Sequence, residues 1–248
     1  MPKQILIPIP STDFDPTECA VPWKLLKDRG MQVQFATPSG ERAKCDRRMI
    51  NGNCLGPLAP FLIADKNGRR AYAELEQDDR FSQPLSWSQL SHHDFDGLIL
   101  PGGHAPGMRE YLESRKLQEV VAEFFENEKP VGAICHGVVL AARSSLNGAS
   151  VLHGRKTTCL LWTQEMMAWG MTALWLGSYY RTYKQTVEAE VKSNLNSLDD
   201  FISGPAPLLR DSLEHVHRGF VVRDGNYISA RWPGDSHRFA MEFLDAVG

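Results

Sequence analysis

The sequence has no apolar run long enough to span a membrane, no large excess of either charge and no paired-cysteine motif. Its most apolar late stretch, residues 160–177, contains Gln164 and Glu165 and is shorter than the ~20 apolar residues of a bilayer span. The formal net charge of −3 gives no reason to expect nucleic acid or an anionic membrane as a partner. The first residues lack the apolar region and cleavage site of a signal peptide, so we expect a cytoplasmic protein.

The cysteines number five, an odd count, and have neither CxxC spacing nor the spacing of zinc ligands. We therefore expect reduced thiols, as in most cytosolic proteins. His92 and His93 are adjacent on an expected loop, where neighbouring imidazoles seldom converge on one ion. The sequence thus predicts neither a bound metal nor another cofactor. The cysteines are Cys19, Cys45, Cys54, Cys135 and Cys159.

Short apolar runs alternate along the chain with helical patterns, which is typical of a parallel sheet flanked by helices. Strands are expected at residues 5–8 and 33–37, joined by a helix that begins after Asp15 and ends near Arg29. An aspartate cap followed by proline favours this helix start. Residues 40–90 carry scattered glycine, asparagine and charge, and we expect loops and short helices there.

The pattern is clearer in the second half of the chain. Residues 97–100 and 131–134 have the composition of short buried strands, with a helix of about five turns between them. A hairpin is expected at residues 220–229, followed by a last helix that begins near Asp235. Since no repeat, low-complexity segment or linker divides the chain, we predict one α/β domain over residues 1–248.

The segment AICHG at residues 133–137 has the pattern of a nucleophile elbow. Such an elbow holds its reactive residue on a strained turn between a strand and a helix, and needs small residues two positions to either side. The helix N-terminus favours a thiolate at Cys135. The backbone N–H of His136 and a second N–H from Gly102 or Gly103 are expected to bind an oxyanion. We predict that Cys135 is a catalytic nucleophile; the alternative is a buried core cysteine.

Two of these segments, GLILPGGH at 97–104 and VGAICHG at 131–137, resemble the matching stretches of the ThiJ/PfpI superfamily. Residues 15–40 are similar to that superfamily's first helix and second strand, and residues 224–247 to its last hairpin and helix. The resemblance implies the class I glutamine amidotransferase-like fold, a three-layer α/β sandwich with a mostly parallel, flavodoxin-like central sheet. Cysteine followed directly by histidine suggests the glyoxalase III/chaperone and PfpI-like groups.

The resemblance also implies a role for Glu18. In the family, a glutamate on the first helix reaches the nucleophilic thiol and often shares a proton with it, and Glu18 occupies that position in PTECAVP. The alternative is structural: counted from Asp15, Glu18 is the third helical residue, where a glutamate completes a capping box.

His136 is a candidate general base, which needs an acid to fix its tautomer. By the resemblance that acid is Glu165, which matches an acidic position of glyoxalase III-like members; the alternative is a polar break in a lid helix. Asp235 and His237 are further candidates, although Asp235 fits a helix N-cap better. His104 is expected to line the pocket or to lie behind the residues that line it, with its ring nitrogens hydrogen-bonded.

Residues 160–183 are rich in aromatic residues and methionine, and hold three of the six tryptophans. Within a helical insertion at about 160–215 we expect helices at about 163–176 and 184–197. Their apolar side chains then cover the sheet edge and form a partly apolar pocket wall above Cys135, or they form a dimer surface.

These observations predict a cysteine-dependent enzyme that acts on small reactive carbonyls, as a glyoxalase III (methylglyoxal to lactate) or a deglycase does. The expected partners are a small-molecule substrate and a second copy of the chain, with no nucleic acid and no membrane. Two alternatives stay open. One is amide or peptide hydrolysis through a thioester at Cys135, for which a Glu165–His136 contact is essential. The other is a stress chaperone or a redox sensor in which Cys135 is oxidised.

Overall fold

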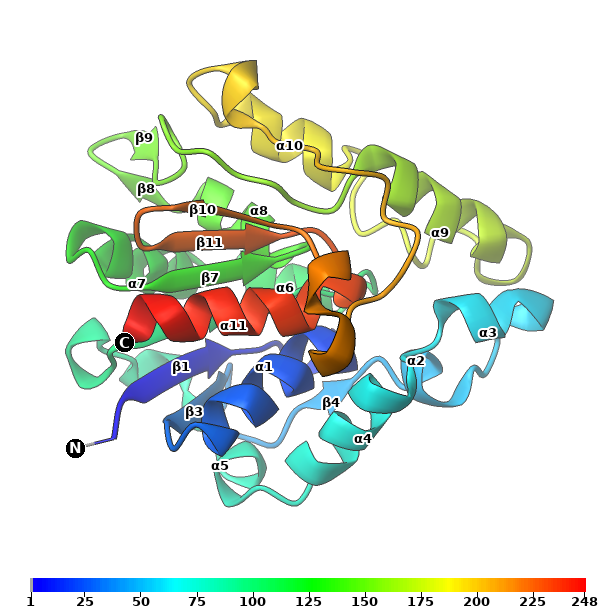
Figure 1. The fold of residues 1–248 in the computed structure, drawn as a ribbon, viewed down its shortest axis with the longest axis horizontal. Coiled ribbons are helices and arrows are strands. Elements are labelled where there is room, and N and C mark those ends of the chain that lie inside the picture. The colour runs from blue at the N-terminus through cyan, green and yellow to red at the C-terminus, as the bar shows by residue number, and fades with distance from the viewer. Residues whose placement is uncertain (1) are drawn as a thin grey trace.

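A seven-stranded sheet is the centre of the computed structural model, which describes residues 2–248 (Figure 1). Its strands lie in the order β10-β11-β7-β6-β1-β3-β5, and neighbours are parallel except for β10 and β11. The predicted α/β fold with a mostly parallel sheet is confirmed. The strands are β1 (Gln4–Pro8), β3 (Gln32–Thr37), β5 (Leu85–Ser86), β6 (Gly97–Leu100), β7 (Val131–Ile134), β10 (Val221–Asp224) and β11 (Tyr227–Ala230).

Helices cover both faces of this sheet and complete the three layers (Figure 1). One face carries α1 and α11, which pack against each other, with α4 against α1. The other face carries α6, α7 and α8. Their bounds are α1 (Pro16–Asp28), α4 (Lys66–Leu75), α6 (Met108–Leu112), α7 (Arg115–Glu126), α8 (Gly137–Arg143) and α11 (Ser236–Val247).

Smaller elements surround these layers. Helices α2, α3 and α9 lie beyond the end toward which the parallel strands point, at the right of Figure 1. Residues 40–90 form loops and short helices, as expected, but they also supply two short strands that were not predicted, one of them the edge strand β5. The helices are α2 (Arg48–Asn51), α3 (Ala59–Leu62), α5 (Asp79–Ser82), α9 (Trp162–Leu176) and α10 (Val187–Ser193), and the paired short strands are β2 (Thr12–Phe14) with β4 (Lys44–Cys45) and β8 (Ser145–Leu146) with β9 (Ala149–Ser150).

Local signals placed most element ends correctly. Asp15 caps α1 by accepting hydrogen bonds from the backbone N–H groups of Thr17 (2.7 Å) and Glu18 (3.0 Å). The predicted hairpin is formed by β10 and β11, which turn at Gly225-Asn226 with Gly225 at a φ of 60°. Among residues 2–248, no helix is both long enough and apolar enough to cross a membrane.

Two helices differ from expectation. The predicted five-turn helix between β6 and β7 is split into α6 and α7. Ser114 separates them, because its hydroxyl accepts a hydrogen bond from the Leu117 N–H (3.3 Å) and caps the second helix. The helix expected at 184–197 is shorter, since α10 begins after the Thr186 cap and ends at Ser193.

Candidate active site

Cys135 occupies a strained turn between β7 and α8. Its φ of 58° lies in the left-handed region, which costs a non-glycine residue about 1–3 kcal/mol. Its backbone N–H donates to the Ala230 carbonyl oxygen (3.0 Å) and so ties the turn to β11. A Cβ on Gly137 would lie 2.0 Å from the Leu100 carbonyl oxygen, so this position accepts only glycine without movement of β6. The backbone therefore has the elbow conformation that the AICHG pattern predicts.

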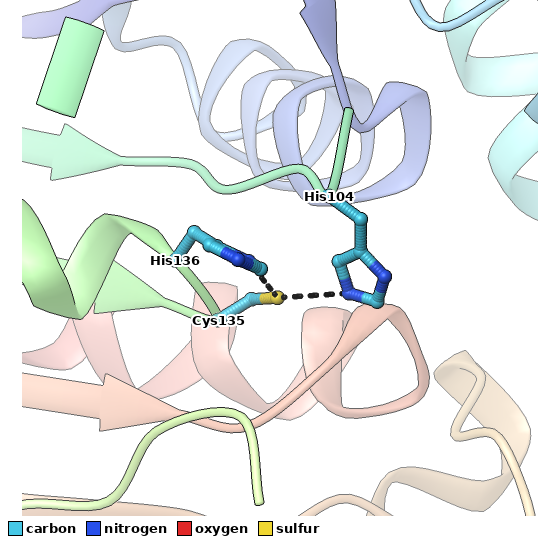
Figure 2. A group of neighbouring side chains, drawn as sticks. All are labelled: His104, Cys135 and His136. Atoms are coloured by element: carbon cyan, nitrogen blue, oxygen red, sulfur yellow. Dashed lines mark hydrogen bonds between the residues drawn. The ribbon is translucent and has the colours of Figure 1, made fainter. Parts of the chain in front are cut away.

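Two imidazole rings flank the sulfur of Cys135 (Figure 2). The Sγ atom lies 3.5 Å from Nδ1 of His136 and 3.6 Å from Nε2 of His104. His136 is buried and His104 is half-buried, and burial lowers the pKa of both, to about 4 for His104. Both rings are consequently neutral at neutral pH. His104, expected to line the pocket, also contacts the thiol directly.

Thr182 sets the tautomer of His136. Its hydroxyl donates to the His104 carbonyl oxygen (2.7 Å), which can only accept. The same hydroxyl lies 3.1 Å from Nε2 of His136, so Nε2 must carry the proton and donate to it. This leaves the Nδ1 lone pair of His136 facing the Cys135 thiol, where it can accept the thiol proton. No sequence signal pointed to Thr182, a residue in a polar turn 46 positions from its partner.

Glu165 does not have the predicted contact with His136, so the expected triad geometry is wrong. Its Oε2 accepts a hydrogen bond from the Val187 N–H (2.9 Å) at the start of α10, and its Oε1 lies 3.8 Å from Nε of Arg181. The first N–H groups of a helix have no partner within the helix, and negative charge is favourable there, so the carboxylate of Glu165 binds the N-terminus of α10. Glu165 thus has a structural role, but it is more than a polar break in a lid helix, because its buried carboxylate links α9 to α10.

The two further candidates for orienting His136, Asp235 and His237, are also engaged elsewhere. Asp235 precedes α11, but its side chain pairs with the buried Arg231 (2.9 Å) instead of capping the helix. His237 bonds to Asp211 (2.9 Å).

Glu18 lies beside the elbow, fully buried. Its Oε2 accepts a hydrogen bond from the Gly102 N–H (2.9 Å), and its Oε1 has no partner among residues 2–248. It therefore does not complete a capping box. A Cβ on Gly102 would lie 2.8 Å from Glu18 Oε2 and 2.9 Å from Cys135 Cβ, so glycine allows carboxyl and thiol to approach each other.

Glu18 and Cys135 influence each other's ionisation, although their geometry falls short of a hydrogen bond. Burial, and then the charge of Asp15, raises the pKa of Glu18. Burial, and then the charge of Glu18, raises the pKa of the Cys135 thiol, while the His136 backbone N–H partly offsets this. Two negative charges are strongly disfavoured in such a site, so the pair holds at least one proton at neutral pH.

The sequence predicted two oxyanion donors, the N–H of His136 and one N–H from Gly102 or Gly103, and the structure distinguishes the two glycines. The Gly102 N–H is occupied by Glu18. Among the described residues, those of Gly103 and His136 have no backbone carbonyl acceptor. We retain these two as the predicted oxyanion donors.

A mostly apolar pocket lies next to His104. Helix α9 supplies part of its wall, as the insertion was expected to do. Cys135 itself is fully buried and does not line this pocket, whereas His104 lines the pocket and contacts the thiol. The pocket encloses about 110 Å³, which suits a small molecule, and its lining includes His104, Leu160, Met167, Met171, Tyr180 and Trp232.

The layered fold and this elbow define an α/β protein with a cysteine at the end of a central strand. The ThiJ/PfpI family-like profile matches residues 9–205, and the chain belongs to this family.

Individual relatives agree with this assignment. The Protein DJ-1 homolog D of Arabidopsis thaliana is 33% identical over 142 residues, which are 57% of this chain but only 31% of that protein. Deglycase PfpI of Pyrococcus furiosus is 25% identical over 234 residues, 94% of this chain and 93% of the relative. The structure of glyoxalase III from Candida albicans has a TM-score of 0.69 at 17% identity, covering 98% and 97% of the two chains, and shares the fold.

Proposed function

We propose that the chain is a cysteine-dependent glyoxalase- or deglycase-type enzyme that acts on small reactive carbonyls. The observation that carries this proposal is the Cys135 thiol held between Glu18 and two neutral imidazoles beside a small apolar pocket. The names of the relatives, a deglycase and a glyoxalase III, support the same class of activity.

With methylglyoxal as substrate, the first step is addition of the Cys135 sulfur to the aldehyde carbon. His136 Nδ1 accepts the thiol proton and passes it to the former aldehyde oxygen, which gives a hemithioacetal. The N–H groups of Gly103 and His136 stabilise the oxygen while it carries negative charge.

The second step is an isomerisation. Glu18 removes the proton from the former aldehyde carbon, which gives an enediol, and returns it to the neighbouring carbon; His136 moves a proton between the two oxygens. The product is a lactoyl thioester of Cys135. Water then hydrolyses this thioester, so the sum is methylglyoxal plus water to lactate plus a proton, with the thiol regenerated.

The contacts of His136 favour this chemistry over amide hydrolysis. A leaving amine needs a proton from an imidazolium, which a buried carboxylate usually stabilises. Here the partner of His136 is the neutral Thr182 hydroxyl, and burial holds the pKa of His136 well below its usual range. In the carbonyl reaction, Nδ1 passes each proton that it accepts to an oxygen that is gaining negative charge, so the imidazolium need only be transient.

The test is D-lactate formation from methylglyoxal in the presence of a chelator. Turnover by the wild type that disappears in Cys135→Ser and Glu18→Gln supports the mechanism. Cys54→Ser is the matched control, because Cys54 is exposed and should not affect turnover. An inactive wild type whose Cys135 still reacts rapidly with iodoacetamide would reject the substrate but not the nucleophile.

A chaperone role is the second candidate, and exposed apolar side chains support it. Met167, Leu174 and Trp175 on α9 are at least half exposed. Suppression of aggregation that survives Cys135→Ser but is lost in Leu174→Ser would favour this role over catalysis.

A further inference from the structure

Three potential metal ligands converge at the elbow (Figure 2). They are His104 Nε2, Cys135 Sγ and His136 Nδ1, and these atoms all lie within 4.8 Å of one another. The sequence predicted no metal site, since its histidines and cysteines lack ligand spacing. The three residues come instead from the turn after β6 and from the elbow, which the parallel sheet brings side by side.

The two sulfur–nitrogen distances match those of a tetrahedral zinc ion. With Zn–S of about 2.3 Å and Zn–N of about 2.0–2.1 Å, the tetrahedral angle separates a sulfur from a nitrogen ligand by about 3.5 Å. The observed separations of Cys135 Sγ from the two ring nitrogens are 3.5 Å and 3.6 Å. The two ring nitrogens lie within 4.8 Å of each other, and binding of one ion requires them to come within about 3.4 Å.

The ring nitrogens have lone pairs available for an ion. Thr182 already fixes the proton of His136 on Nε2, so Nδ1 is free to coordinate. Among the described residues no group holds Nδ1 of His104, so that ring can carry its proton there and coordinate through Nε2. Metal binding then displaces one proton, that of the Cys135 thiol, and forms one metal–sulfur and two metal–nitrogen bonds.

The surroundings also suit a cation. Thr182 contacts both histidines, through the ring of His136 and the carbonyl oxygen of His104, which is the arrangement of an outer-shell residue that orients ligands. Glu18 adds a second, independent feature: its buried Oε1 atom has no hydrogen-bond partner among residues 2–248. A dication beside the Glu18–Cys135 pair compensates the negative charge that burial disfavours there.

We propose that His104, Cys135 and His136 form a binding site for a thiophilic d¹⁰ cation such as Zn²⁺, and that an ion bound there blocks the chemistry of Cys135. Thiolate and imidazole are ligands that such ions prefer. Inhibition of turnover rests on the proposed function, whereas metal binding and protection of the thiol do not.

Binding is tested with Co²⁺, a spectroscopic substitute for zinc, and by Zn²⁺ competition with a chromophoric chelator. We expect one equivalent of tight Co²⁺ with a thiolate-to-cobalt charge-transfer band, lost in Cys135→Ser and His104→Ala. Thr182→Val should weaken Zn²⁺ binding by about 10–100-fold, because its hydroxyl orients both histidines. Circular dichroism establishes that each variant is folded.

Cys54→Ser and His217→Gln are matched controls, since Cys54 is exposed and His217 lies in a surface cluster with His215. Both controls should bind like the wild type. Binding that is lost in a control but kept in Cys135→Ser would show adventitious surface binding and overturn the proposal, as would no tight binding to the wild type.

The unmodified chain provides a second measurement that needs no variant. One equivalent of Zn²⁺ should slow alkylation of Cys135 by iodoacetamide at least tenfold, and a chelator should restore it. Unchanged alkylation in the presence of bound Zn²⁺ would overturn the proposal. Absence of methylglyoxal turnover in chelator would instead contradict the proposed function and leave the metal site standing.

Discussion

Helices α8 and α9 bury opposite kinds of residue. In α8, which follows the elbow, every residue from Gly137 to Ala142 is buried and nearly all are apolar. In α9 the buried residues are Gln164, Glu165 and Thr172, while Leu174 is 88% exposed. Hydrophobic burial thus holds α8 on the sheet, whereas α9 is held by hydrogen bonds of its buried polar residues together with a few apolar contacts such as that of Leu176.

The position of each helix explains this difference. Helix α8 packs against β6 and β7, so its side chains lose contact with water. Helix α9 projects beyond the sheet (Figure 1), and it is attached by the bond from Val187 N–H to Glu165. Its apolar residues face the pocket or the surface, where they are available to a substrate or a partner.

The largest effect is expected at the elbow. Gly137→Ala places a Cβ 2.0 Å from the Leu100 carbonyl oxygen, which forces a backbone shift between α8 and β6. We expect a loss of about 3 kcal/mol or more in the free energy of unfolding. Urea titration followed by circular dichroism measures it, and a loss below 1 kcal/mol would contradict the tight elbow.

A buried charge at the start of α1 should make stability depend on pH. Burial raises the pKa of Asp15 from 3.8 to about 6. The folded state therefore binds this proton more tightly than the unfolded state, so the contribution is present below pH 4 and is lost as the pH rises to about 6. The loss amounts to at most about 3 kcal/mol.

Asp15→Asn isolates this effect, because asparagine keeps the cap acceptor without the charge. We expect the variant to lose this pH dependence and to be more stable than the wild type at pH 7. Thermal unfolding at pH values from 4 to 7 measures both. Identical pH profiles for the two proteins would show that Asp15 is not the group responsible.

In α9 a polar residue should matter more than a large apolar one. Glu165→Ala leaves the Val187 N–H without its partner, and we expect a loss of about 1–3 kcal/mol in unfolding free energy. The Leu174 side chain is already mostly exposed, so Leu174→Ala should change the free energy of unfolding by no more than about 0.5 kcal/mol. The reverse order in urea titrations would mean that α9 is held by hydrophobic contact.

The smallest effect is a gain. Gly170 lies inside α9, and a Cβ built there meets no atom within 4 Å. Gly170→Ala should therefore stabilise the helix by about 0.5–1 kcal/mol, with turnover and thiol alkylation unchanged. Glycine to alanine is thus expected to stabilise the protein in α9 and to destabilise it at Gly137. Equal changes in the free energy of unfolding at the two positions would contradict the difference in packing between α8 and α9.

The sequence was informative where a local rule restricts the residue type. The elbow needs small flanking residues, the α1 start needs a cap, and the β10–β11 turn needs glycine at positive φ. The sequence was uninformative where a polar side chain can form either of two hydrogen bonds. Ser114 interrupts a pattern that is apolar on both sides, and Glu165 bonds to a helix end instead of to His136.

From the sequence alone, the parallel sheet and the position of Cys135 at the end of one of its strands followed, because strand, cap and turn preferences act within a few residues. The place of Glu18 beside Cys135 came from the family resemblance, since the local cap rule favoured a structural role for it. Tertiary structure decided which groups touch the sulfur. Thr182 meets the His104 carbonyl from 78 positions away, and no short-range pattern encodes such a contact. The neutral rings follow from burial of both histidines in the folded chain, and only the fold brings His104 and His136 to the same sulfur.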